Sequence, residues 1–130
     1  MNTKNEETKL LDLQIITTII YIASLILSIY LTYNDKLELF EEKPLFDDKL
    51  SNKLAIFNRV LIVILSLSYL YISNKNINIV SSKKENIFPF KLQLVGSELS
   101  TLATVVVLYA VLLTSGEQYS IVSGIGNPNL

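Results

Sequence analysis

The stretch Leu92–Thr114, LQLVGSELSTLATVVVLYAVLLT, indicates the fold class of the whole chain. It matches the roughly 20 apolar residues that a helix needs to cross a bilayer core of about 30 Å. Glu98 is its only charged residue. Two further apolar segments, Leu13–Tyr33 and Leu54–Ile72, have similar length. Three such segments in 130 residues predict a chain of membrane-spanning helices.

The composition supports one membrane domain over residues 1–130. Half of the residues are hydrophobic, the mean hydropathy is +0.42, and most charges lie between the apolar segments. We therefore expect an all-α fold, with three transmembrane helices in an antiparallel bundle, short polar connectors and an irregular C-terminal tail. The expected spans are about 10–33, 45–73 (with an amphipathic first part) and 90–115, followed by a tail over 116–130.

Several classes of function are disfavoured by what the sequence lacks. A net charge of −1 gives no basic field for nucleic acid. The chain has no cysteine and no histidine, so thiolate chemistry is excluded and the commonest general base and metal ligand are missing. We expect no cofactor, no metal site and no enzymatic activity.

Small residues in the third span predict a helix-packing seam. They recur at steps of three and four residues, the spacing that lets helices approach closely in a membrane. The seam consists of Gly96, Ser100, Ala103, Val107 and Ala110. Its partner is either another helix of the chain, which is tethered nearby, or a second copy.

Glu98 is the centre of a candidate polar site within the membrane. It lies about 9 Å into the third helix, at the level of polar groups on the other two spans if the helices are antiparallel. The predicted site combines Glu98 with Gln14, Thr17, Ser66 and Tyr69. An ionisable group at this depth is a functional-site hypothesis, as a proton or cation relay or a contact to a partner. The alternative is a structural Glu98 near the headgroups that bonds to Lys91 or water.

Arg59 lies near the start of the apolar part of the second span. We expect it at the membrane interface, where its long side chain reaches phosphate or pairs with an acid of the connector. The functional alternative is an arginine in an ion pathway. Pro44 is expected in the first turn of the second helix, a position that proline tolerates.

The charges give a weak prediction of topology. The N-terminal segment and second connector hold six bases (Lys4, Lys9, Lys75, Lys83, Lys84 and Lys91), and the other side holds five (Lys36, Lys43, Lys49, Lys53 and Arg59). The positive-inside rule then places the N-terminus in the cytoplasm and the C-terminus outside.

Four stretches resemble small three-span membrane proteins of low-GC Gram-positive bacteria. These are a leucine-rich first span, KPLF…FNR at the start of the second, SELS in the third, and the ending Gly-x-x-Asn-Pro-x-Leu. The resemblance implies a multi-pass protein of the bacterial cell membrane and no particular activity.

Two functions remain open at this stage. The first is a non-enzymatic subunit or scaffold of a membrane complex, with the lipid bilayer and a membrane-protein partner, or the chain itself, as its contacts. The second is a self-assembling small pore, a holin-like protein or a carrier that uses Glu98.

Overall fold

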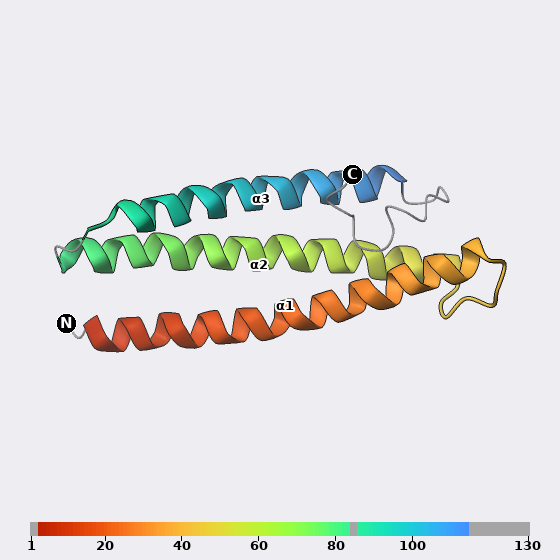
Figure 1. Cartoon of the computed structure of the whole chain (residues 1–130), viewed down its shortest axis with the longest axis horizontal. Coiled ribbons are helices and arrows are strands. Elements are labelled where there is room, and N and C mark those ends of the chain that lie inside the picture. The colour runs from red at the N-terminus through yellow and green to blue at the C-terminus, as the bar shows by residue number, and fades with distance from the viewer. Residues whose placement is uncertain (1–2, 84–85, 115–130) are drawn as a thin grey trace.

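The computed structural model describes residues 3–83 and 86–114, which form three antiparallel helices (Figure 1). They are α1 (Thr3–Leu39), α2 (Asp48–Ser82) and α3 (Phe88–Thr114). The described ranges contain no strand, and all three helices are long and apolar enough to cross a membrane. The all-α fold with three membrane-competent helices is confirmed. The predicted irregular tail, 116–130, lies outside the described residues.

The first two helices extend beyond the predicted spans. α1 has 37 residues and α2 has 35, which correspond to about 55 and 52 Å at 1.5 Å per residue. α2 continues to Ser82 because the polar stretch after residue 73 still carries apolar residues at helical spacing, and Ile79 and Val80 are buried. Helical packing therefore reaches beyond the apolar segment itself.

α2 begins three residues later than predicted, at Asp48. The side chain of Asp47 accepts a hydrogen bond of 2.7 Å from the backbone N–H of Leu50, which satisfies one of the free donors of the first turn. Pro44 consequently lies in the connector before the helix, and not in its first turn. The aspartate cap fixes the start of α2.

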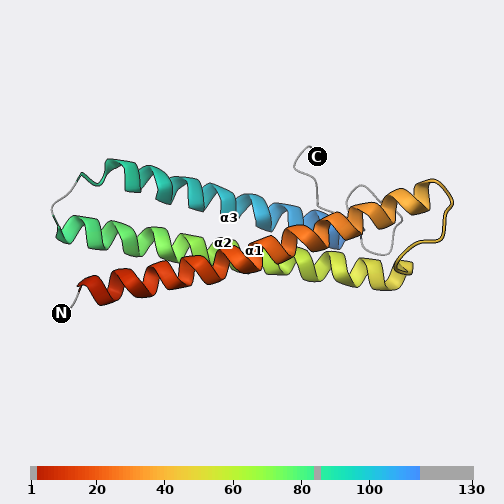
Figure 2. The ribbon, with the colours of Figure 1, turned by 60° about the horizontal axis from the view of Figure 1, so that its bottom comes forward.

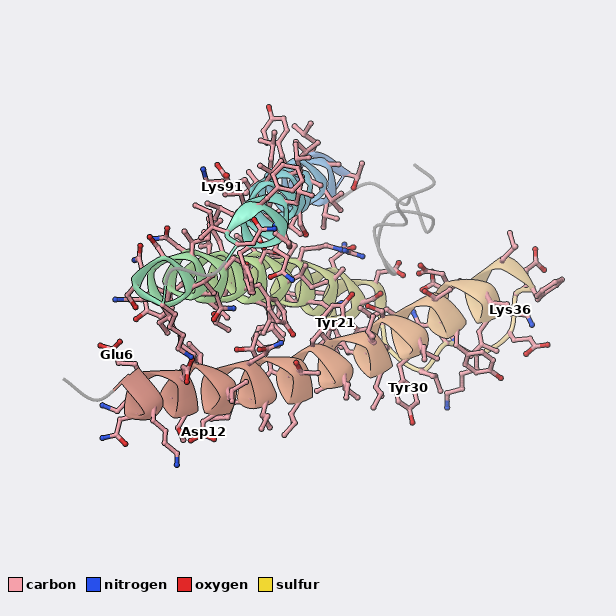
Figure 3. The ribbon with its side chains drawn as sticks, turned by 60° about the vertical axis from the view of Figure 1, so that its left-hand side comes forward. Glu6, Asp12, Tyr21, Tyr30, Lys36 and Lys91 are labelled. Atoms are coloured by element: carbon pink, nitrogen blue, oxygen red, sulfur yellow. The ribbon has the colours of Figure 1, made fainter. Side chains whose placement is uncertain are left out.

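α2 lies between the other two helices. α1 and α3 both pack on it, and within the described residues the backbones of α1 and α3 do not come close to each other (Figures 1 and 3). α1 crosses α2 obliquely (Figure 2), and Asp12 and Tyr30 lie on the side of α1 turned away from α2 (Figure 3). The three helices therefore form an open arrangement. We call the space between α1 and α3, on the surface of α2, the corner.

The contact between α1 and α2 contains two apolar clusters. Leu10 packs with Ile72 and Ile79 at one end, and Leu31 packs with Ala55 near the other, where Val111 of α3 joins them. Four of the six buried positions of α1 recur every seven residues, at Leu10, Thr17, Ser24 and Leu31. This period is typical of helices packed side by side with a left-handed twist.

α3 contacts α2 through a line of residues one position away from the predicted seam. The residues on this line are buried or half-buried: Leu94, Ser97, Thr101, Thr104, Leu108 and Val111. One residue turns a helix by about 100°, so the predicted seam lies on a flank of the contact. Gly96, Ser100 and Ala103 are exposed there, while Val107 and Ala110 are half-buried. Both lines alternate steps of three and four, so periodicity alone does not distinguish them.

Candidate functional site

A polar cavity lies in the corner between α1 and α3, with α2 as its floor. Its volume is about 410 Å³. We call it the inner cavity. Its lining consists of Gln14 from α1, Ser66, Tyr69, Ile72, Ser73 and Asn76 from α2, and Gln93, Gly96, Ser97 and Ser100 from α3. The structure therefore brings together Gln14, Ser66 and Tyr69 of the predicted polar site.

A second cavity lies next to the inner cavity, nearer to the ends of the helices. Its volume is also about 410 Å³, and it shares Gln14 and Asn76 with the inner cavity. We call it the outer cavity. Its walls are mostly apolar, with Leu10 and Val80 among them, and it ends at the partly exposed ion pair between Lys83 Nζ and Glu7 Oε1. The two neighbouring cavities together extend from the level of this ion pair to the level of Ser66.

Hydrogen bonds hold two edges of the inner cavity. The hydroxyls of Thr18 and Tyr69 share a bond of 2.9 Å, which connects α1 to α2. The hydroxyls of Ser73 and Ser97 share another of 2.9 Å, which connects α2 to α3. Thr101 Oγ1 also donates to the carbonyl of Ser66 at 3.4 Å, as well as to its own helix. These bonds fix the positions of the helices around the cavity.

Glu98 does not belong to this cavity. We expected its side chain to point inward, but it is exposed and absent from the lining. The position of Glu98 along α3 follows from the sequence. The direction of its side chain depends on which line of residues on α3 contacts α2. Because that line contains Ser97, Glu98 lies about 100° round the helix, on the flank opposite Gly96.

Thr17, the remaining member of the predicted site, is buried between α1 and α2. Its exposed fraction is 3%, and its hydroxyl donates to the carbonyl of Leu13 at 2.7 Å. It is therefore satisfied by its own helix. The predicted site is thus divided among the inner cavity, the α1–α2 contact and the outer flank of α3.

Arg59 is buried, which corrects the expectation of an interfacial side chain. Its exposed fraction is 7%, and its Nε and Nη2 atoms are buried without a hydrogen-bond partner. Two helical turns separate it from Ser66, which contacts α3, so Arg59 lies on the α3-facing side of α2. It is about 6 Å from the middle of the apolar segment Leu54–Ile72, at four residues and 1.5 Å each. Burial by neighbouring helices keeps it from the headgroups.

A buried hydrogen-bond network that was not predicted from the sequence connects α1 and α2. Ser24 Oγ donates to Asn58 Oδ1 at 2.6 Å, and Asn58 Nδ2 donates to Ser28 Oγ at 2.8 Å. Ser28 Oγ in turn donates to the carbonyl of Ser24 at 3.1 Å. The available signal was a single asparagine in an apolar run, opposite two serines one turn apart on α1. Such a pattern predicts a hydrogen bond between spans.

The fold and its three spans define a helical multi-pass membrane protein. In the described part of the chain, no group of three or more Asp or Glu side chains could hold a metal ion. No family model matches the chain, and neither the curated proteins nor the solved structures compared with it include a match.

Proposed function

We propose that this chain is a non-enzymatic subunit of a membrane complex, located in the bacterial cell membrane. The observation that carries the proposal is the position of Glu98. Its carboxylate is exposed on the flank of α3 away from the inner cavity, and it makes no hydrogen bond or ion pair with the described residues.

The depth of Glu98 makes that exposure informative. It lies about 9 Å into an apolar segment that begins at Leu92, within a hydrocarbon core of about 30 Å. Leu102 and Tyr109 on the same flank are 62% and 63% exposed. Ionisable side chains at such depth usually face protein or a water-filled cavity. A partner helix with a basic or hydrogen-bonding side chain would satisfy Glu98 there.

Extraction in a mild detergent followed by native mass measurement tests the proposal. The wild-type chain of 14.6 kDa should be recovered in a larger assembly. Glu98→Ala should reduce the assembled fraction about tenfold, because a hydrogen bond to a charged group contributes about 1.5–3 kcal/mol. Asp12→Ala is the matched control, since this exposed carboxylate lies on the far side of α1 (Figure 3). Recovery of the wild-type chain alone would contradict the proposal.

A self-assembling pore, holin-like protein or carrier is the second candidate. It is favoured by the exposed part of the small-residue seam, Gly96, Ser100 and Ala103, which no helix of the chain covers. Flux through liposomes containing the wild type or Glu98→Gln separates the two candidates. Flux that is lost in Glu98→Gln would support a carrier. No flux with the wild type would favour the subunit.

We further propose a cytoplasmic N-terminus and an external C-terminus. With Arg59 buried, the bases number six on the N-terminal side against Lys36, Lys43, Lys49 and Lys53 on the other, which is six against four. The positive-inside rule favours the side with more bases. Protease protection of a tag at each terminus measures the orientation.

A further inference from the structure

The amide side chains around the inner cavity have unused hydrogen-bonding capacity. Gln14, Asn76 and Gln93 each carry two donors and one carbonyl acceptor, and none of these amides bonds to another described residue. The hydroxyls of Ser66 and Ser100 are also without a partner among the described residues. The cavity therefore presents a concentrated set of free donors and acceptors.

These groups extend from the membrane surface almost to its centre. Ser66 lies about 5 Å from the middle of the apolar segment of α2, and Asn76 about 20 Å from it, at 1.5 Å per residue. The hydrocarbon core ends at about 15 Å from its middle. Polar groups in hydrocarbon without a partner are costly, so lipid tails are a poor occupant for the inner part of this cavity.

Access is from the end of the molecule that carries the ion pair. The inner and outer cavities are neighbours, because Gln14 and Asn76 line both, and Glu7 and Lys83 line the outer one. Those two residues lie beyond the apolar segments. A molecule dissolved in water can therefore enter along the corner between α1 and α3 without crossing the hydrocarbon.

The lining selects for neutral molecules. Among the described residues, no Asp, Glu, Lys or Arg lines the inner cavity, and Glu98 lies on the other flank of α3. An ion at this depth would lose its hydration without gaining a counter-charge, whereas a neutral molecule loses far less. A volume of 410 Å³ equals about 14 water molecules at roughly 30 Å³ each, which sets the scale of an occupant.

We infer that the inner cavity is a water-filled vestibule that binds small neutral molecules rich in hydroxyl or amide groups. The three amides and the serine hydroxyls would donate to and accept from such a molecule at the inner end, and the outer cavity would admit it. This site is independent of the proposed partner surface, because Glu98 lies on the opposite flank of α3.

The absence of native cysteine allows a direct test of water access. Single cysteines at Ser66 and at the neighbouring Leu67 differ by one residue in depth, but only Ser66 lines the cavity, whereas Leu67 is 50% exposed on the outside. In nanodiscs, a neutral, water-soluble thiol reagent should modify Ser66→Cys at least tenfold faster than Leu67→Cys. Ser100→Cys and Leu102→Cys form a second pair on α3, should one pair fail to fold. Equal rates within a correctly folded pair would overturn the vestibule.

A second measurement tests the class of ligand. Anionic and cationic thiol reagents of similar size are compared with the neutral one, and each rate at Ser66→Cys is divided by the rate at Asn76→Cys, near the entrance. This ratio should be at least tenfold lower for both charged reagents than for the neutral reagent. Equal ratios for all three would overturn selectivity for neutral molecules, even where water access holds.

Discussion

The contact between α1 and α2 differs from that between α2 and α3 in the neighbouring polar residues that α2 contributes to each, although Asn34 of α1 also leaves its buried Nδ2 without a partner. In the first, Asn58 uses both ends of its amide with Ser24 and Ser28. In the second, the buried Arg59 leaves Nε and Nη2 without partners. The two contacts also differ in apolar burial. Among the described residues, α3 contributes one buried residue, Val111, to the apolar clusters.

α3 packs on α2 at least as extensively as α1 does, so the two contacts differ in which side chains they bury and in what the outer helix leaves exposed. α1 and α2 are joined by buried side chains along their length and by an ion pair at one end. Within the described residues, the backbone of α3 lies close to that of α2 alone, and α3 carries exposed polar or small residues on both flanks, Glu98 on one and Ser100 on the other. Both the proposed partner surface and the vestibule therefore depend on α3.

The largest expected effect comes from removing the buried charge. Arg59→Met replaces the guanidinium with an apolar side chain of similar length. It should raise the free energy of unfolding by about 1 to 4 kcal/mol, because buried charges without good partners are often less stable than apolar substitutes. Unfolding by SDS titration in mixed micelles, followed by circular dichroism, measures the change.

Arg59→Lys is the control variant, since it keeps the positive charge and has fewer hydrogen-bond donors. It should give no such gain. A loss of stability in Arg59→Met would contradict the contrast between the two contacts, because it would mean that the guanidinium is well paired.

A smaller effect is expected from breaking the satisfied contact. Asn58→Ala removes two buried hydrogen bonds between α1 and α2, each contributing about 0.6 to 1.7 kcal/mol in membrane proteins. The same titration should show a loss of about 1 to 3 kcal/mol. Ser97→Ala, which removes a single bond between α2 and α3, should lose about 0.6 kcal/mol. A larger loss for Ser97→Ala than for Asn58→Ala would reverse the comparison.

The smallest effect concerns the flank of α3. A side chain at Gly96 would meet nothing within 4 Å. Gly96→Ala should therefore raise the free energy of unfolding of the isolated chain by about 0.5 to 1 kcal/mol, which is the gain in helix propensity. A loss measured by SDS titration would show that the flank is packed within the chain, as the small-residue pattern first indicated.

The elements of this fold were predictable from the sequence, but the directions of side chains were not. Hydropathy gives the number and order of the spans because length and apolar content are properties of each segment alone. It underestimates their ends, since residues such as Ile79 pack in a helix whose exposed positions are polar. The start of α2 was visible in Asp47, a preferred capping residue, and was assigned to Pro44 instead.

The candidate site shows the same limit. Antiparallel order correctly places Gln14, Ser66 and Tyr69 at one level, because depth follows from counting residues. Glu98 lies at the level of the cavity, next to Ser97, but its side chain is exposed outside it and does not point inward as predicted. If the line of α3 that contacts α2 shifts by one residue, the side chain of Glu98 turns from the inside to the outside. Which line makes the contact depends on how α3 packs on α2, and the sequence of one span alone does not determine this.

The length of α1 and α2 has a practical consequence for imaging a protein of only 14.6 kDa. Beyond the apolar segments, residues 3–12 of α1 and 73–82 of α2 continue as paired helices, each adding roughly 15 Å at 1.5 Å per residue. The packing of Leu10 against Ile79 and the ion pair between Glu7 and Lys83 hold these two helix ends together. A helical marker protein fused in register at Thr3 would therefore inherit a fixed orientation, and would give electron microscopy a feature large enough to align.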